Sequence, residues 1–330
     1  MTTTSSRSPC KLPAGLREPG DTPLSRHRAR MLGPAAPATR ALRRRPRAHR
    51  RMTHPPDTTP PRVLSIAGSD SGGGAGIQAD LKAIARCGGH GMTALTAVTA
   101  QNTVGVRSVF ALPAETVLDQ VRAVVEDIGV DAVKIGMLGS AETIAAVGRA
   151  LDLTAGAPVV LDPVMVAESG ARLLDPEAEG ALRELLLPRA TVVTPNLEEA
   201  RVLAERTATA GGDDAEALAR AVHRLGPRSV VITGGHRKEV ADVFFDGERL
   251  ESIAGERHPA GAAHGSGCTH SSALATFLAR GLDPLEAARG AKSVASDAVR
   301  HGLRGLGRGA GPVDALGVLE WAPGRVSRLA

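Results

Sequence analysis

Short apolar runs rich in β-branched residues alternate with amphipathic stretches along the chain, beginning at Arg62. The runs predict strands over 62–67, 93–99, 131–136, 158–162, 191–194, 229–233, 239–245 and 250–254. Between them, apolar positions at helical spacing predict helices, for example over 75–87 and 114–128. Such alternation is typical of an α/β fold with a mostly parallel sheet. No repeat or long linker interrupts it, so we expect one domain over 62–325.

Residues 1–61 differ from the rest of the chain. They hold 13 basic and 3 acidic residues and show no apolar periodicity, so we expect a disordered basic tail. The net charge of +5 comes from this segment, because the remainder, with 27 basic and 32 acidic residues, carries −5. Arg-rich, acid-poor segments also serve as nucleic-acid arms or transit peptides. A further alternative is that translation starts at Met52.

Composition excludes several classes of protein. Hydrophobic residues make up 42% of the 330 residues and charged residues 23%, as in globular domains. Aromatic residues are only 2%, which leaves few rings to stack on bases, so we expect no nucleic-acid partner. No apolar run reaches the ~18 residues of a membrane span, so we expect no membrane partner. The widely spaced Cys10, Cys87 and Cys268, without a secretory signal, predict a cytoplasmic protein.

A glycine-rich turn follows the first predicted strand, in the stretch AGSDSGGGAGIQAD (67–80). Glycines at this point let the backbone approach a ligand closely. The stretch matches a loose GxGxxA dinucleotide fingerprint, but no acidic residue occurs between Asp80 and Glu115, where that fingerprint needs one. No GxxxxGK[ST] motif is present. A nicotinamide-dependent dehydrogenase and a P-loop kinase are therefore both disfavoured.

A second glycine-containing turn precedes a strong helical pattern in HGSGCTHSSALATFLA (264–279). The amides of Gly265, Ser266 and Gly267, at a helix start, predict an anion hole for a transferring phosphoryl group. Cys268 follows in the first helical turn, where the helix dipole lowers a thiol pKa, so it can act as a base or a nucleophile. The alternative for Cys268 is an inert, packed side chain. His264 and His270 flank it, and we assign neither a catalytic role.

A third candidate site is TPNLEEA (194–200), after a predicted strand. Asn196 and Glu199 are three residues apart at a helix start, so both side chains can organise a hydrated Mg²⁺. The alternative is structural, because Asn at an N-cap with Glu three residues later forms a capping box. The spacing does not decide between the two.

Seven motifs in chain order resemble the hydroxymethylpyrimidine and phosphomethylpyrimidine kinases of thiamine biosynthesis, members of the ribokinase-like superfamily. They are AGSDSGGGAGIQADLK (67–82), TAVTAQNTVGV (96–106), VKIGML (133–138), VVLDPVM (159–165), TPNLEEA (194–200), ITGGH (232–236) and HGSGCT (264–269). The resemblance implies a three-layer αβα fold, ribokinase-like, whose central sheet carries substrate and ATP along its C-terminal edge. It also implies that Cys268 is catalytic, at the position where sugar kinases carry Asp.

The resemblance further implies roles for individual residues. It assigns the aminopyrimidine substrate to Gln101, Asp80, Met137, Val164 and Gly68. It assigns phosphate and nucleotide contacts to Asn196, Glu199, Thr233 and Gly235, and it places Mg²⁺ near Asp162 and, through water, Glu199. Two positions depart from the family pattern: many relatives have Lys at the position of Thr233 and Thr at the position of Ser266.

The expected activity is phosphorylation of 4-amino-5-hydroxymethyl-2-methylpyrimidine and then of its monophosphate, with ATP and Mg²⁺ as cofactors. An alternative on the same fold is a pyridoxal or pyridoxine kinase, with single or dual specificity. An alternative from another class is a non-catalytic ligand- or nucleic-acid-binding protein that uses the basic tail. The resemblance also leads us to expect a homodimer.

Overall fold

The computed structural model describes residues 59–167, 170, 172–204, 214–234, 240–259 and 261–318. The basic tail up to residue 58, with Met52, lies outside the described residues, as does Gly235. The chain divides into Met1–Pro55 and Pro56–Ala330, and every feature below belongs to the second unit.

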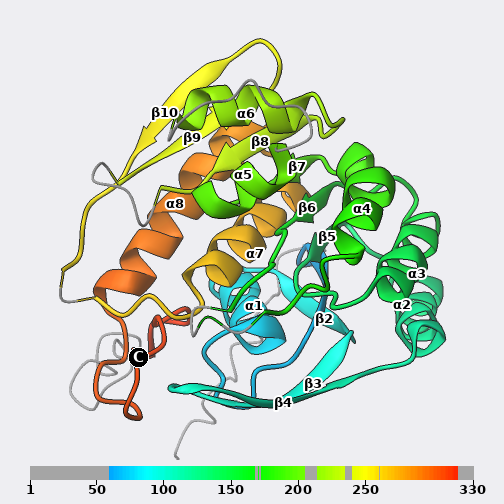
Figure 1. Ribbon diagram of the computed structural model, residues 1–330, viewed down its shortest axis with the longest axis horizontal. Coiled ribbons are helices and arrows are strands. Elements are labelled where there is room, and N and C mark those ends of the chain that lie inside the picture. Colours follow the sequence, from blue (N-terminus) through cyan, green and yellow to red (C-terminus); the bar gives the residue numbers. More distant parts are fainter. Residues whose placement is uncertain are drawn as a thin grey trace, which may run out of the picture. The chain divides into compact units, whose positions relative to one another are not determined.

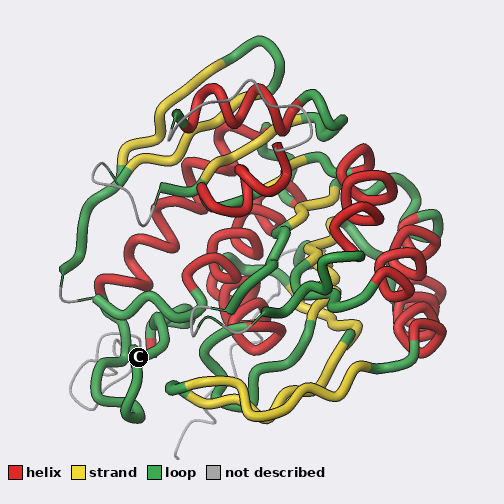
Figure 2. The backbone as a smooth tube through the Cα atoms, viewed as in Figure 1, coloured by secondary structure: helices red, strands yellow, loops and turns green. Residues whose placement is uncertain are grey.

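An eight-stranded sheet forms the centre of this unit (Figures 1 and 2). Its spatial order is β10 (Leu250–Ala254), β9 (Ala241–Phe245), β8 (Ser229–Ile232), β7 (Val192–Val193), β6 (Val159–Leu161), β5 (Ala132–Ile135), β1 (Arg62–Ala67) and β2 (His90–Leu95). The strands from β2 to β8 pair in parallel, while β9 and β10 are antiparallel. Strands β5 to β8 are buried along their whole length, because helices cover both faces of a parallel sheet.

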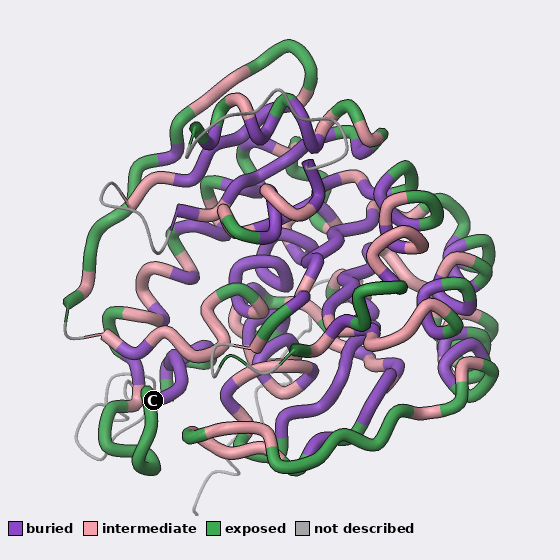
Figure 3. Tube along the Cα trace, in the orientation of Figure 1, coloured by how far each residue is buried: buried purple, intermediate pink, exposed green. Residues whose placement is uncertain are grey.

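Two layers of helices bury the two faces of the sheet (Figure 3). The first layer contains α2 (Ala114–Asp127), α3 (Ala141–Leu151), α4 (Ala178–Ala181), α5 (Leu197–Ala204) and α6 (Ala215–His223). The second layer contains α1 (Gly76–Arg86), α7 (Ser266–Ala279) and α8 (Pro284–Arg300). A π-helical turn, Leu182–Leu186, and a 3₁₀ turn, Leu187–Arg189, follow α4. The predicted three-layer αβα fold is confirmed.

One predicted strand is wrong in its boundaries. The chain does not run as a single strand over 93–99 but leaves the sheet at Thr96, whose amide donates to the Ala67 carbonyl and whose hydroxyl donates to the Met137 carbonyl. It then forms a separate antiparallel hairpin of β3 (Ala97–Asn102) and β4 (Gly105–Ala111). This hairpin carries one substrate candidate, Gln101, to the C-terminal edge of the sheet.

Among the described residues, no helix is both long enough and apolar enough to span a membrane.

Candidate active site

One cavity of about 820 Å³ opens at the carboxyl ends of the parallel strands. The residues that follow five neighbouring strands all line it: Gly68 after β1, Met137 after β5, Asp162 after β6, Thr194 after β7 and Thr233 after β8. Carboxyl ends of parallel strands meet at one edge of a sheet, which is where ligands bind in open α/β folds. The motifs separated along the chain therefore converge in space.

The start of α7 forms one wall of the cavity. Gly265 caps the helix with φ of +86°, and a Cβ at this position would lie 1.8 Å from the carbonyl oxygen of Gly74, so only glycine fits. The Ser266 amide donates to the Ala263 carbonyl at 2.9 Å, which engages one of the three predicted anion-hole amides. The amides of Gly267 and Cys268 belong to the first helical turn, whose N–H groups have no carbonyl partner within the helix, and both residues line the cavity.

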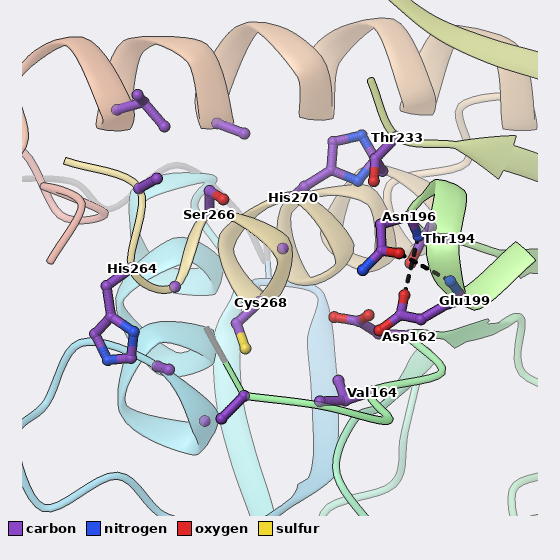
Figure 4. Close-up of a pocket in the computed structure, with 18 of the residues that line it drawn as sticks. Asp162, Val164, Thr194, Asn196, Glu199, Thr233, His264, Ser266, Cys268 and His270 are labelled. Carbon is purple, nitrogen blue, oxygen red and sulfur yellow. Dashed lines mark hydrogen bonds between the residues drawn. The ribbon is translucent and has the colours of Figure 1, made fainter. Parts of the chain in front are cut away.

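The thiol of Cys268 lies beside the cavity in an environment unlike the expected one (Figure 4). Burial raises the pKa of Cys268 to about 12, and the negative charges of Asp80 and Asp162 act in the same direction. The positive charge of Lys134 opposes them. The expectation that the helix dipole would give a low thiol pKa is wrong, because desolvation by burial outweighs the dipole.

Asp80 does not line the cavity, so the structure corrects its expected contact with the pyrimidine. Its carboxylate is fully buried and pairs with the Lys134 ammonium at 2.9 Å and 3.0 Å. It also accepts hydrogen bonds from the hydroxyls of Ser65 at 2.6 Å and Ser272 at 2.8 Å. Asp80 therefore acts on the cavity through Lys134, which does line it. The sequence reasoning missed Lys134, although a lysine within a buried strand is a signal in itself.

Asp70 is a second residue that the sequence reasoning missed. Its carboxylate accepts hydrogen bonds from the amides of Gly72, Gly74 and Ala75 at 2.8 Å to 3.0 Å, and it lies 3.0 Å from Nε2 of His264. Burial acts to raise the pKa of Asp70, but His264 and these amides lower it below its ordinary value. Asp70 thereby ties the glycine-rich turn to the segment before α7. An Asp that begins a glycine-rich turn is a recognisable Asx-turn signal.

Asn196 and Glu199 form the reciprocal pair that a capping box requires. The Asn196 amide donates to the Glu199 carboxylate, and the Glu199 amide donates to the Asn196 side-chain oxygen, both at 2.9 Å (Figure 4). Both residues also line the cavity, so the capping box confirms the structural interpretation and leaves the functional one a prediction. Burial and, to a smaller extent, the charge of the nearby Asp162 raise the pKa of Glu199 to about 8.

Asp162 and Glu199 are neighbouring carboxylates that both have raised pKa values, and a bound cation would favour their ionised forms. Burial raises the pKa of Asp162, although Lys134 and a 3.0 Å hydrogen bond from Ser271 oppose this effect. The buried hydroxyl of Thr194, next to them, has no hydrogen-bond partner. Within the described residues, no group of three or more His, Cys, Asp or Glu side chains is arranged so that it could hold a metal ion. The donor set therefore fits a hydrated Mg²⁺ rather than a fully ligated ion.

The remaining substrate candidates lie in the wall of the same cavity: Gln101, Met137, Val164 and Gly68. A Cβ at Gly68 would lie 2.4 Å from the Met137 methyl group, so the glycine makes room for this apolar side chain. The Gln101 amide donates to Ser71 at 2.8 Å, and its side chain reaches the cavity from the hairpin.

Thr233 lines the other end of the cavity and donates its amide to the Pro195 carbonyl at 2.9 Å. A buried ion pair that the sequence reasoning missed lines this end too. Lys292 of α8 donates to Asp242 of β9 at 2.6 Å, and Asp242 also accepts the Gly234 amide at 2.8 Å. Lys292 therefore brings an ammonium group to the end of the cavity where many relatives have Lys at the position of Thr233.

Comparison with known proteins identifies the family. A family model described as phosphomethylpyrimidine kinase matches residues 70–314. The chain is 48% identical over 267 residues to the hydroxymethylpyrimidine/phosphomethylpyrimidine kinase of Streptomyces coelicolor, covering 80% of this chain and 97% of the relative. It is also 48% identical over 258 residues to the thiamine biosynthesis bifunctional protein ThiED of Geobacter sulfurreducens, covering 76% of this chain but only 51% of that longer relative.

A similar solved structure is the pyridoxal kinase from Staphylococcus aureus in complex with AMP-PCP and pyridoxal. The TM-score is 0.70 at 34% sequence identity, and the match covers 78% of this chain and 94% of that one.

Proposed function

The chain belongs to the phosphomethylpyrimidine kinase family, and from this premise we propose that it phosphorylates 4-amino-5-hydroxymethyl-2-methylpyrimidine with ATP, and then phosphorylates the resulting monophosphate to the diphosphate used in thiamine biosynthesis. The observation that carries the proposal is the single cavity that joins Gln101, the start of α7 and the Asn196–Glu199 pair. A phosphoryl donor and a small ring can therefore meet at one point.

The pyrimidine ring lies between Met137 and Val164, with the side-chain amide of Gln101 at its edge. A Gln amide offers a donor and an acceptor side by side, which complements an exocyclic amine next to a ring nitrogen. This arrangement directs the hydroxymethyl group toward Cys268.

Phosphoryl transfer passes through a loose transition state, so the protein mainly aligns the groups and neutralises charge. The amides at the start of α7 receive the transferring phosphoryl group, and the helix dipole favours its charge. Cys268 holds the acceptor hydroxyl and takes its proton late in the transfer. Burial acts to lower the pKa of Lys134, but the charges of Asp80, Cys268 and Asp162 raise it. The Lys134 ammonium therefore stays charged and favours the thiolate that this step requires, against the burial that raises the pKa of Cys268.

Asp162 and Glu199, with the Thr194 hydroxyl beside them, would hold Mg²⁺ with its waters. When bound, the ion neutralises charge on the phosphate oxygens. Asn196 keeps the Glu199 carboxylate oriented through the two hydrogen bonds described above.

The second phosphorylation requires a phosphorylated acceptor in the same pocket. The turn of Gly72, Gly73 and Gly74, which Asp70 organises, is the element we propose to accommodate that phosphate. The amides of all three glycines already donate to Asp70, so the turn would contribute room rather than donors, because its residues carry no side chains.

A phosphate-resolved turnover assay tests this function on the full chain. With ATP, Mg²⁺ and the hydroxymethylpyrimidine, we expect the monophosphate to appear first and then the diphosphate, and Cys268→Ala should reduce kcat by ~10² or more. Equal rates in the variant would mean that Cys268 only packs.

Pyridoxal is the second candidate acceptor, favoured by the likeness to the Staphylococcus aureus pyridoxal kinase. The comparison of kcat/KM for the two acceptors decides between them, and a clear preference for pyridoxal would overturn the pyrimidine assignment.

A homodimer and a cytoplasmic location complete the proposal. The two cysteines among the described residues, Cys87 and Cys268, are both free, which agrees with a reducing compartment. Light scattering on the purified chain measures the oligomeric state.

A further inference from the structure

His270 is buried, lines the cavity and has no hydrogen-bond partner on either ring nitrogen. It is 4% exposed, and its Nε2 lies 3.6 Å from the Asp242 carboxylate, beyond hydrogen-bond reach. Burial lowers the pKa of His270, while Asp242 raises it and Lys292 lowers it. The ring is therefore neutral near pH 7 and offers one donor and one acceptor. An unpaired polar side chain this deeply buried normally costs stability, so it calls for a ligand.

The position of His270 on α7 limits what that ligand can be. Residues 268 and 270 are two positions apart, which turns their side chains about 200° from each other around the helix. Figure 4 shows this arrangement, with Cys268 and His270 on opposite sides of α7 and His270 on the side that carries Thr233. The rise between them is only about 3 Å, so the His270 ring lies close to the amides at the helix start.

Phosphoryl transfer requires attacking and leaving oxygens on opposite sides of the phosphorus. With the transferring group at the start of α7 and the acceptor on the Cys268 side, the leaving phosphate lies on the other side of the helix start. The side chains gathered there can donate hydrogen bonds: the His270 ring, the Thr233 hydroxyl and the Lys292 ammonium, which Asp242 fixes in place.

We propose that His270, together with Lys292, binds the phosphate chain of the nucleotide on its leaving-group side. A phosphate oxygen accepts the N–H of the His270 ring, which satisfies the buried donor, and Lys292 supplies positive charge beside it. This inference rests on the proposed kinase function but does not depend on which small molecule accepts the phosphoryl group.

Nucleotide affinity without any acceptor tests the inference. In the full chain, His270→Leu should raise the Kd of ADP by roughly 10- to 100-fold, as expected for the loss of a hydrogen bond to a charged group. Tripolyphosphate, used as a competitor, should lose affinity to a similar extent, and adenosine should not. His270→Gln, which keeps a donor, should remain within about threefold of the natural chain. The matched control is His223→Leu, because His223 packs against Phe245 and does not line the cavity.

The Tm of the nucleotide-free protein separates a binding role from a structural one. Leu removes two unsatisfied buried nitrogens, so His270→Leu should not lower Tm. An unchanged Kd for ADP in His270→Leu would overturn the inference. Equal losses for adenosine, or a His270→Gln variant that binds as weakly as the Leu variant, would overturn the phosphate contact. If turnover showed pyridoxal as the acceptor while ADP affinity still depended on His270, the pyrimidine assignment alone would fail.

Discussion

Replacing Glu199 with Gln should stabilise the nucleotide-free protein and weaken its response to Mg²⁺. Glu199 is 8% exposed, and its carboxylate lies near that of Asp162. Gln has nearly the same shape and carries no charge. Its side-chain oxygen can still accept the Asn196 amide, as the carboxylate does at 2.9 Å.

The size of the effect follows from the raised pKa of Glu199. That pKa is about 8, against an ordinary 4.5. Because the pKa of Glu199 is raised in the folded state, the protonated carboxyl contributes its full stability to the fold below about pH 4.5. This contribution to the free energy of unfolding is lost as pH rises through about 8. At about 1.36 kcal/mol per pH unit, the loss is about 3 kcal/mol at pH 7 and nearly 5 kcal/mol at pH 9. A chain of this size should then gain roughly 6 to 12 °C in Tm at pH 7 on substitution.

Thermal unfolding in EDTA between pH 5 and pH 9 measures the effect on the natural chain and Glu199→Gln. The Tm difference should widen as pH rises, and Mg²⁺ should narrow it, because a cation beside the carboxylates favours their ionised form. Glu198→Gln is the matched control, since its side chain is 81% exposed on the same helix and should show no widening. A Tm difference that stays constant with pH, or a less stable Glu199→Gln at pH 8, would refute the reasoning.

Other positions give sharp expectations. Because a pKa of about 12 leaves few thiolates, Cys268 in the nucleotide-free chain should react with iodoacetamide at pH 8 roughly a thousandfold more slowly than a free thiol. Peptide mass mapping measures the rate, and rapid labelling with a midpoint near pH 8.5 would contradict the burial argument. Gly265→Ala should destabilise the chain far more than Gly139→Ala, since both have positive φ but only Gly265 meets a carbonyl at 1.8 Å, and urea unfolding compares them. By the same assay, Lys134→Met should cost about 3 to 5 kcal/mol by leaving Asp80 buried and unpaired, and Asp80→Asn in the same chain should recover part of it. Equal stability of Lys134→Met and the double variant would show that the cost of losing Lys134 does not come from the unpaired charge of Asp80.

The sequence predicts the regular elements well where one face of an element is buried. The helices expected over 75–87 and 114–128 are found as Gly76–Arg86 and Ala114–Asp127, since apolar spacing records the buried side. Strand β4 was not predicted because most of its residues are exposed, so no alternation marks a buried face. The break at Thr96 depends on carbonyls from two other strands, which local sequence does not specify.

Much of the candidate site could also be predicted, because it consists of residues that follow strands or begin helices. Asp162 directly follows β6, while Asn196 and Gly265 precede α5 and α7, and all three line the cavity. Asp80 could not be placed this way, since it lies inside α1 and its partner Lys134 is 54 residues away. The packing of α1 against the sheet decides whether Asp80 faces the cavity or a buried charge, and the local sequence does not show this packing.

Three of the five unpaired buried side-chain atoms among the described residues belong to Thr194 and His270 in the cavity wall, where Glu199 also lies, and this pattern is itself an argument for function. Glu199 retains a raised pKa, His270 has two unpaired nitrogens, and the Thr194 hydroxyl has no partner. Each costs stability in the nucleotide-free chain, yet each gains a partner if a cation or a phosphate chain enters. A cavity that only filled space would satisfy or remove such groups. Hence Glu199→Gln and His270→Leu should both leave the protein without ligands at least as stable as the natural chain. Glu199→Gln should weaken the binding of Mg²⁺, and His270→Leu should weaken the binding of the nucleotide.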